Sequence, residues 1–120
     1  MLEKVVRLTV DLTVNDGQGE EFKSVAAAMN AGSDAEPGTL GYEWFFAADG
    51  KTVRLLEVYA DTAAIEAHFI GPVVGGLVPK LAQLCKVDRL EIYGDPGPKV
   101  TAMAAGLGGR VFAYWAGISR

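Results

Sequence analysis

Two ionisable side chains, Glu57 and His68, are the residues of this sequence best suited to acid–base chemistry. His68 is the single histidine of the chain, and Glu57 is the single acid of the segment 53–59. A histidine that titrates near neutral pH can take the proton of a phenol, and a nearby carboxyl can orient the histidine or accept the proton itself. Both residues also have a structural interpretation, because buried histidines and strand acids often only satisfy hydrogen bonds.

Aromatic residues accompany this pair. A two-residue loop at Asp49-Gly50 would place Tyr42 opposite Glu57 in a hairpin. Three further aromatic side chains are expected nearby: Trp44, Tyr59 and Phe69. An apolar pocket with a few converging polar groups suits a flat hydrophobic ligand such as a quinol or an aromatic polyketide, although Trp44 and Tyr59 could equally be core fillers.

Several other chemistries lack the residues they need. One histidine and one cysteine cannot supply a His/Cys zinc cluster, and the acids lack calcium-loop spacing. No G-x-x-x-x-G-K-[ST], strand-linked G-x-G-x-x-G or G-x-S-x-G motif occurs. We therefore expect no metal site, no cofactor, and no nucleotide or serine-hydrolase chemistry.

Composition indicates one folded domain. Half of the 120 residues are apolar, 22% are charged, and mean hydropathy is +0.20. The net charge of −4 gives no electrostatic basis for binding nucleic acid or an anionic membrane surface. The lone Cys85 permits no internal disulfide, the charged N-terminal residues 1–7 do not resemble a signal peptide, and no apolar run reaches the ~20 residues of a membrane span. We expect a cytoplasmic protein.

Hydrophobic periodicity predicts the first half of the fold. Residues 5–14 alternate strictly between apolar and polar, which is typical of a strand with one buried face. Phe22, Val25, Ala26 and Met29 form a helical stripe that should end at 31–33. Strands at 39–47 and 51–60 follow around Asp49-Gly50. The expected register pairs Phe46 with Val53, Trp44 with Leu55 and Tyr42 with Glu57, and a slip of one residue would reverse both faces.

The second half repeats the pattern. Asp61 is a helix N-cap, and the next helix carries Ile65, His68 and Phe69 on one stripe. Gly71-Pro72 should interrupt this helix, and the helical spacing that resumes at 73–84 should kink near Pro79. A strand at 86–93, a short helix at 99–105 and a possible fifth strand at 110–116 complete the chain.

The element order predicts an α+β, ferredoxin-like βαββαβ fold, with an antiparallel sheet and both helices on one face. Residues 1–96 would form this domain, and 97–120 a C-terminal extension packing on it or on a partner. Because the hairpin is apolar on both faces and the helices cover only one, a second subunit is the simplest cover for the other. We expect a homodimer.

Two segments carry more specific patterns. The segment EPGTLGYE at 36–43 has an acid-Pro-Gly turn followed by a Tyr-Glu pair, and LEVYADTAAIEAH at 56–68 runs from an acidic strand into a helix bearing Ala-His. Together they resemble the antibiotic biosynthesis monooxygenase (ABM)-like family of dimeric α+β barrels, including its quinol monooxygenase type, over about residues 4–95.

This resemblance implies a homodimer whose sheets face each other, with a pocket between sheet and helices in each subunit. Characterised relatives oxidise aromatic polyketides or quinols with molecular oxygen and no metal or flavin, since the substrate anion itself activates oxygen. The leading hypothesis is therefore a cofactor-independent monooxygenase. His68 would be its general base or orienter, Glu57 the acidic companion, and six side chains the substrate-binding walls: Tyr42, Trp44, Leu55, Tyr59, Ile65 and Phe69.

Three positions depart from the anthrone-oxidising branch. That branch has an asparagine four positions before a tryptophan on this strand, and a tyrosine on the helix, where this chain has Leu55, Tyr59 and Ile65. Leu55 favours a second hypothesis, a non-catalytic protein that binds a small apolar metabolite. A third is haem binding, because the haem-degrading branch also carries a helical histidine, matched here by His68.

Overall fold

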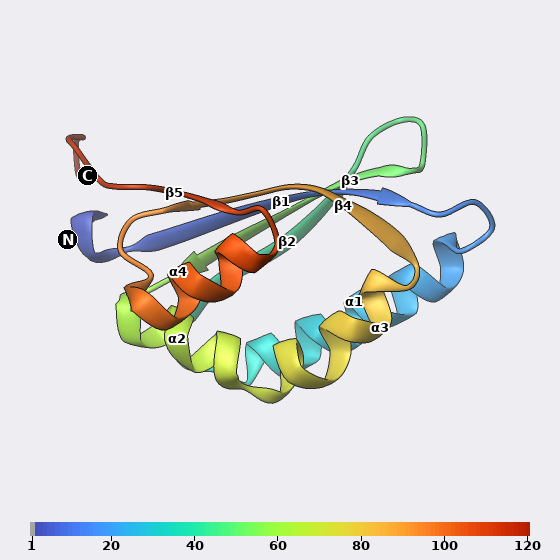
Figure 1. The fold of residues 1–120 in the computed structure, drawn as a ribbon, viewed down its shortest axis with the longest axis horizontal. Coiled ribbons are helices and arrows are strands. Elements are labelled where there is room, and N and C mark those ends of the chain that lie inside the picture. The colour runs from blue at the N-terminus through green and yellow to red at the C-terminus, as the bar shows by residue number, and fades with distance from the viewer. Residues whose placement is uncertain (1) are drawn as a thin grey trace.

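The protein folds as a five-stranded sheet with every long helix on one face, as the ribbon shows (Figure 1). The structure is a computed structural model that describes residues 2–120, so Met1 lies outside the described part. The strand order β2-β3-β1-β4-β5 is the ferredoxin-like order with one strand added at an edge. The elements are η1 Leu2–Lys4, β1 Val6–Val14, α1 Gly19–Asp34, β2 Thr39–Phe46, β3 Thr52–Tyr59, α2 Thr62–Ile70, η2 Val73–Leu77, α3 Val78–Ala82, β4 Cys85–Tyr93, α4 Gly97–Gly106 and β5 Arg110–Phe112.

The central strand β1 has the predicted alternation. Its apolar residues Val6, Leu8, Val10, Leu12 and Val14 are at most 9% exposed and form the middle of the core. β1 pairs antiparallel with both β3 and β4, so the core side of the sheet is fixed by this one strand.

The β2–β3 hairpin has the register expected from Asp49-Gly50. Tyr42 faces Glu57, Trp44 faces Leu55 and Phe46 faces Val53. The pairing shifts between Thr39 and Gly41, however, and Leu40 is 61% exposed. This irregularity adds one residue to β2, so Leu40 does not continue the alternation that puts Tyr42 and Trp44 on one face.

Helix α1 continues to Asp34, beyond its expected end at 31–33. Gly32 lies in its last turns, where a β-carbon would come within 2.6 Å of Val73 Cγ2. The glycine therefore allows α1 and η2 to pack closely, and it does not end the helix as its propensity alone suggested.

The segment from α2 to α3 is a nearly continuous helix. Asp61 caps it by accepting a hydrogen bond from Ala64 N at 2.9 Å. As expected, Gly71-Pro72 interrupts the helix, because α2 ends at Ile70 and Gly71 has an extended backbone. The chain then forms a π-helical segment, η2, and Pro79 lies in the first turn of α3, where its missing N–H is tolerated.

This continuity also corrects the expectation that no apolar run reaches the length of a membrane span. The helical run Thr62–Ala82 has 21 residues and a best-window hydropathy of 1.2, which would allow a crossing by length and composition alone. In the structure, Ile65, His68 and Phe69 of this run are buried in the domain. The run therefore serves here as part of the helical layer over the sheet (Figure 1).

The C-terminal extension adds α4 and a short edge strand. β5 spans Arg110–Phe112 only, and it runs parallel to β4, so the sheet is mixed and not purely antiparallel. β5 stops where its partner stops, since Gly94 N, just beyond β4, donates the last hydrogen bond to Phe112 O at 2.9 Å. The strand that was expected to extend to residue 116 therefore ends at Phe112.

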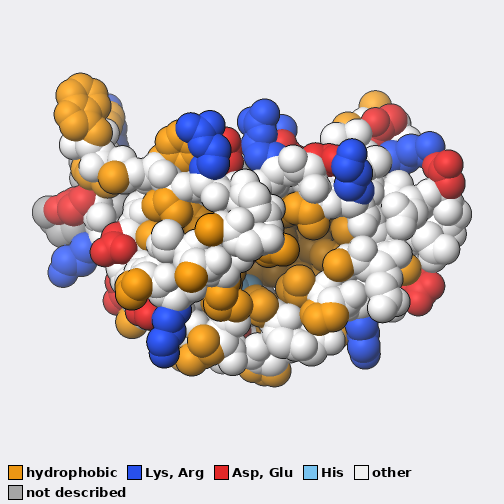
Figure 2. Space-filling model, in the orientation of Figure 1, with side chains coloured by type: hydrophobic (Ala, Val, Ile, Leu, Met, Phe, Trp, Pro, Cys, Tyr) orange, Lys and Arg blue, Asp and Glu red, His pale blue; other side chains and the backbone are white. Residues whose placement is uncertain are grey.

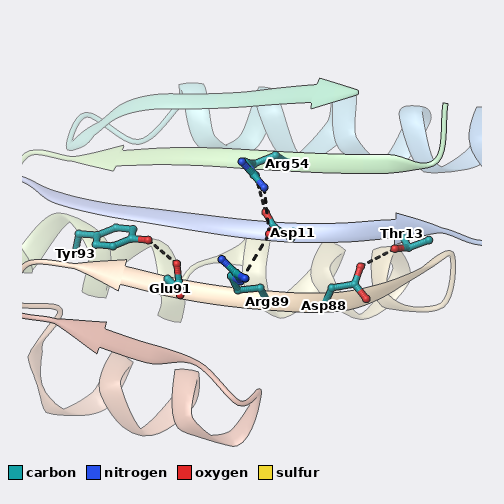
Figure 3. Close-up of polar contacts among 7 residues, drawn as sticks. All are labelled: Asp11, Thr13, Arg54, Asp88, Arg89, Glu91 and Tyr93. Atoms are coloured by element: carbon teal, nitrogen blue, oxygen red, sulfur yellow. Dashed lines mark hydrogen bonds and ion pairs between the residues drawn. The ribbon is translucent and has the colours of Figure 1, made fainter. Parts of the chain in front are cut away.

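The sheet face opposite the helices carries a polar network (Figure 3). Arg54 bonds Asp11 with Nε to Oδ1 at 2.7 Å, and Arg89 Nε lies 3.9 Å from the same carboxylate. The aromatic ring of Phe45, which pairs with Arg54 across the hairpin, is on this face and is 50% exposed.

Candidate functional site

A mostly apolar cavity of about 100 Å³ lies between the sheet and the helices. Its mouth is the hollow rimmed by hydrophobic side chains in the space-filling view (Figure 2). Three of its lining residues carry polar groups, namely Tyr42, Glu57 and His68. The others are Leu8, Val10, Leu12, Met29, Leu55, Phe69, Val74, Val78, Leu81, Val87, Leu90 and Leu107.

Glu57 and His68 meet at the polar end of the cavity. Glu57 comes from β3 and is 5% exposed, and His68 comes from α2 and is 2% exposed. His68 Nε2 lies 3.9 Å from Glu57 Oε1, which is beyond direct hydrogen-bond distance. A ligand hydroxyl seated between them could bond both groups.

A third ionisable residue, Glu36, completes the cluster. Its Oε1 lies 2.7 Å from His68 Nδ1 and accepts a second hydrogen bond from Thr39 Oγ1 at 2.8 Å. Glu36 belongs to the acid-Pro-Gly pattern of the sequence, but its 32-residue separation from His68 gives no periodic signal that would pair the two residues. The motif alone could have indicated it.

The turn that carries Glu36 is held against α2 by a glycine. A β-carbon on Gly38 would lie 2.5 Å from Ala64 Cβ, so only glycine permits this approach. Ala64 is one helical turn before His68, and the close contact therefore sets the distance from which Glu36 reaches the imidazole.

Burial controls the protonation of the carboxyl in the cavity. Desolvation raises the pKa of Glu57, the hydrogen bond from Tyr59 lowers it and the nearby Glu36 carboxylate raises it, and together they bring it to about 7. Tyr59 donates its hydroxyl to Glu57 Oε1. Burial and the acidic neighbours also raise the pKa of both tyrosines, Tyr42 and Tyr59, so these hydroxyls remain protonated donors.

The residues expected to form the walls divide into two groups. Tyr42, Leu55 and Phe69 line the cavity. Trp44, Tyr59 and Ile65 do not, contrary to the expectation for a pocket wall. Trp44 packs edge-on against Phe22 and donates Nε1 to Asn30 Oδ1 at 2.6 Å, while Tyr59 and Ile65 are 0% exposed in the core behind the site.

One lining residue comes from the C-terminal extension. Leu107, just after α4, reaches the cavity although it is 58% exposed. No periodic pattern in the sequence marks it, since it lies in a glycine-rich turn. The extension is therefore part of the cavity and not only of the sheet edge.

The chain is similar to a known protein family in sequence and to several solved structures in fold. The family described as Antibiotic biosynthesis monooxygenase matches residues 5–75. MupZ from Pseudomonas fluorescens aligns with a TM-score of 0.84 and 21% identity, over 98% of this chain and 95% of that one. The C-terminal extension thus has a counterpart in MupZ.

Two further structures share the main domain. SnoaB from Streptomyces nogalater, described as a cofactor-independent oxygenase, aligns with a TM-score of 0.68 and 20% identity, over 79% of this chain and 96% of SnoaB. Rv0793 from Mycobacterium tuberculosis aligns with a TM-score of 0.68 and 19% identity, over 78% and 97%. These identities establish a common fold only. No curated protein matches the chain in sequence.

Proposed function

Because the chain belongs to the antibiotic biosynthesis monooxygenase family, we propose that it oxidises a small phenol or quinol with molecular oxygen, without a metal or flavin. The observation that carries this proposal is the polar end of the apolar cavity, where Glu57 and His68 converge near the ring of Tyr42. The cavity supplies what an oxygen-activating substrate anion requires, namely a base, a polar anchor and exclusion of water.

The chemistry assigns a distinct task to each group. The ionised Glu57 carboxylate or His68 Nε2 removes the substrate proton, and the resulting anion transfers electrons to oxygen. For a hydroquinone with an unsubstituted ring carbon the balance is C₆H₆O₂ + O₂ → C₆H₄O₃ + H₂O. One oxygen atom enters the hydroxyquinone product, the other leaves as water, and the quinol supplies the electrons. A carboxyl whose pKa is about 7 suits this cycle, because near neutral pH it can accept a proton and return it.

The size of the cavity favours a one-ring substrate. About 100 Å³ is less than the roughly 150 Å³ of an engineered cavity that binds benzene. A volume below that of a one-ring site leaves no room for a fused tricycle, so a monocyclic quinol with its substituents toward the mouth is favoured. Leu55 in the lining adds to this apolar, restricted shape.

Haem does not fit these residues. The macrocycle is several times larger than the cavity, and His68 is 2% exposed with Nδ1 bonded to Glu36. The cavity and its histidine therefore argue against haem as the ligand.

A binding protein without catalysis is the second candidate, favoured by Leu55 in place of a polar side chain beside Glu57. It shares the cavity and the ligand class with the first candidate. The two differ only in whether oxygen is consumed.

Oxygen uptake by purified protein distinguishes them. We expect uptake with monocyclic hydroquinones that exceeds uptake with anthrones, and a loss of at least about 100-fold in kcat for His68→Ala and for Glu57→Gln. Glu43→Gln, which removes an exposed carboxyl from β2, is the matched control. Saturable quinol binding without oxygen uptake would instead support the binding protein.

A further inference from the structure

The Glu36–His68 pair connects the buried cavity to the protein surface. The side chain of His68 is 2% exposed, whereas that of Glu36 is 20% exposed and reaches solvent. The two ring nitrogens of His68 have different surroundings, with Nε2 toward Glu57 and the cavity and Nδ1 on Glu36 at 2.7 Å. A proton entering at one nitrogen can therefore leave from the other.

We propose that Glu36 is a positioning and proton-relay residue, which holds His68 with Nδ1 protonated and carries protons between the closed cavity and water. This inference rests on the proposed function for its role in turnover but not for the relay itself. It would explain how a substrate can be deprotonated in an apolar cavity while the ligand blocks the mouth.

The relay conserves protons in two half-cycles. In the first, His68 Nε2 takes a proton from the ligand hydroxyl, Nδ1 passes its own proton to the Glu36 carboxylate, and Glu36 releases that proton to water. In the second, Glu36 takes a proton from water and returns it to Nδ1, while Nε2 gives its proton to the reduced oxygen. His68 then has its initial tautomer again.

The surroundings leave His68 no other ionisable partner among the described residues it contacts. Glu36 faces it from the turn before β2, and Glu57 faces it from β3. The ring centroids of Tyr42 and Tyr59 lie 5.5 and 5.3 Å from the centroid of the imidazole. Both tyrosine hydroxyls stay protonated, and Glu57 is buried with the cavity. Glu36 alone among these groups combines contact with His68 and access to solvent.

The first test needs no substrate. Because His68 is the only histidine, nitrogen NMR of uniformly labelled protein reports one imidazole. We expect the Nδ1–H tautomer in the wild type, and exchange of this proton with water at least about 10-fold slower in Glu36→Gln, which keeps an acceptor but cannot carry a proton. Glu36→Asp should restore part of the exchange, and Glu43→Gln should leave it unchanged.

A second variant tests whether the contact between Glu36 and His68 matters, and not merely the presence of the Glu36 carboxyl. Gly38→Ala places a methyl group against Ala64 and should move the turn that carries Glu36. The Glu36 carboxyl is then still present, but its hydrogen bond to His68 is lost. Its His68 signals should show a mixture of tautomers. A wild-type Nε2–H tautomer, or equal exchange in wild type and Glu36→Gln, would overturn the proposal.

Turnover provides the final arm. With a hydroquinone that the wild type oxidises, Glu36→Gln should lower kcat about 10-fold or more with little change in KM, and should increase the solvent isotope effect. An unchanged kcat would reject the role in turnover. If no quinol is oxidised while the NMR result holds, the oxygenase proposal fails and the relay stands.

Discussion

At the scale of single residues, the buried carboxyl of Glu57 ties function to stability. Its pKa is raised from 4.5 to about 7 by burial, so the folded protein holds a proton that the unfolded chain has already released in this range. The folded state binds more protons between these values, and the free energy of unfolding must fall as pH rises from about 4.5 to 7. Above about 7 both states are ionised and the decrease ends.

Glu57→Gln should remove this pH dependence. As the pH rises from 4.5 to 7, the free energy of unfolding of the wild type should fall by about 3 kcal/mol relative to that of the variant. Above pH 8 the difference between the two proteins should stay constant. Urea unfolding followed by circular dichroism at a series of pH values measures it. A difference between the two proteins that is constant across this range would contradict a raised pKa.

The hydroxyl of Tyr59 sets the upper end of that range. Its hydrogen bond to Glu57 stabilises the carboxylate and lowers the pKa of Glu57 against the effect of burial. Tyr59→Phe should therefore move the end of the pH-dependent decrease above 7, in addition to a loss of about 1 kcal/mol for the hydrogen bond. The same unfolding series checks it, and a shift to lower pH would contradict this account.

At the scale of elements, local patterns were sufficient where one signal dominated. The Asp49-Gly50 turn set the hairpin register and so placed Tyr42 opposite Glu57, and the apolar stripe of α2 placed His68 and Phe69 inward. Predictions failed where packing overrides propensity. Gly32 remains helical because Val73 lies against it, and Leu40 is displaced by an irregularity in pairing that alternation does not reveal.

The cavity was only partly predictable for the same reason. Strand and helix periodicity identify a face, but not which residues of that face border empty space. Tyr59 and Ile65 fill the core behind the cavity and Trp44 packs against Phe22, whereas Leu107 enters from a turn with no periodic signal. The role of Glu36 could not be predicted from periodicity, because Glu36 contacts His68 across 32 residues of sequence.

The C-terminal extension is fixed to the sheet by another glycine. A β-carbon on Gly109 would lie 2.8 Å from both Ala104 O and Leu90 Cδ2, and Leu90 lines the cavity. Gly109→Ala should therefore destabilise the protein by about 1–3 kcal/mol. Gly106→Ala is the matched control, because nothing lies within 4 Å of its added methyl and alanine favours the helix by roughly 0.5–1 kcal/mol. Equal urea midpoints for the two variants would show that the extension tolerates displacement.

At the scale of the whole molecule, the sheet has one face under helices and one face without cover (Figure 1). The uncovered face combines the half-exposed ring of Phe45 with charges of both signs around Asp11. A two-fold interface brings each surface against its own copy, and mixed charges with apolar side chains are compatible with such pairing. We propose that this face joins two copies into a homodimer.

Charge on the uncovered face should then separate the subunits. Phe45→Asp would place a carboxylate in the buried part of the interface, and we expect the dissociation constant of the dimer to increase by about 100-fold or more. Ile70→Asp is the matched control, because Ile70 is 72% exposed on α2, on the helical side of the sheet. Sedimentation velocity over a concentration series measures both variants. Since the cavity lies on the helical side, a Phe45→Asp monomer should still bind its ligand. A wild type that is monomeric at all concentrations would contradict the homodimer and leave the uncovered face to another partner.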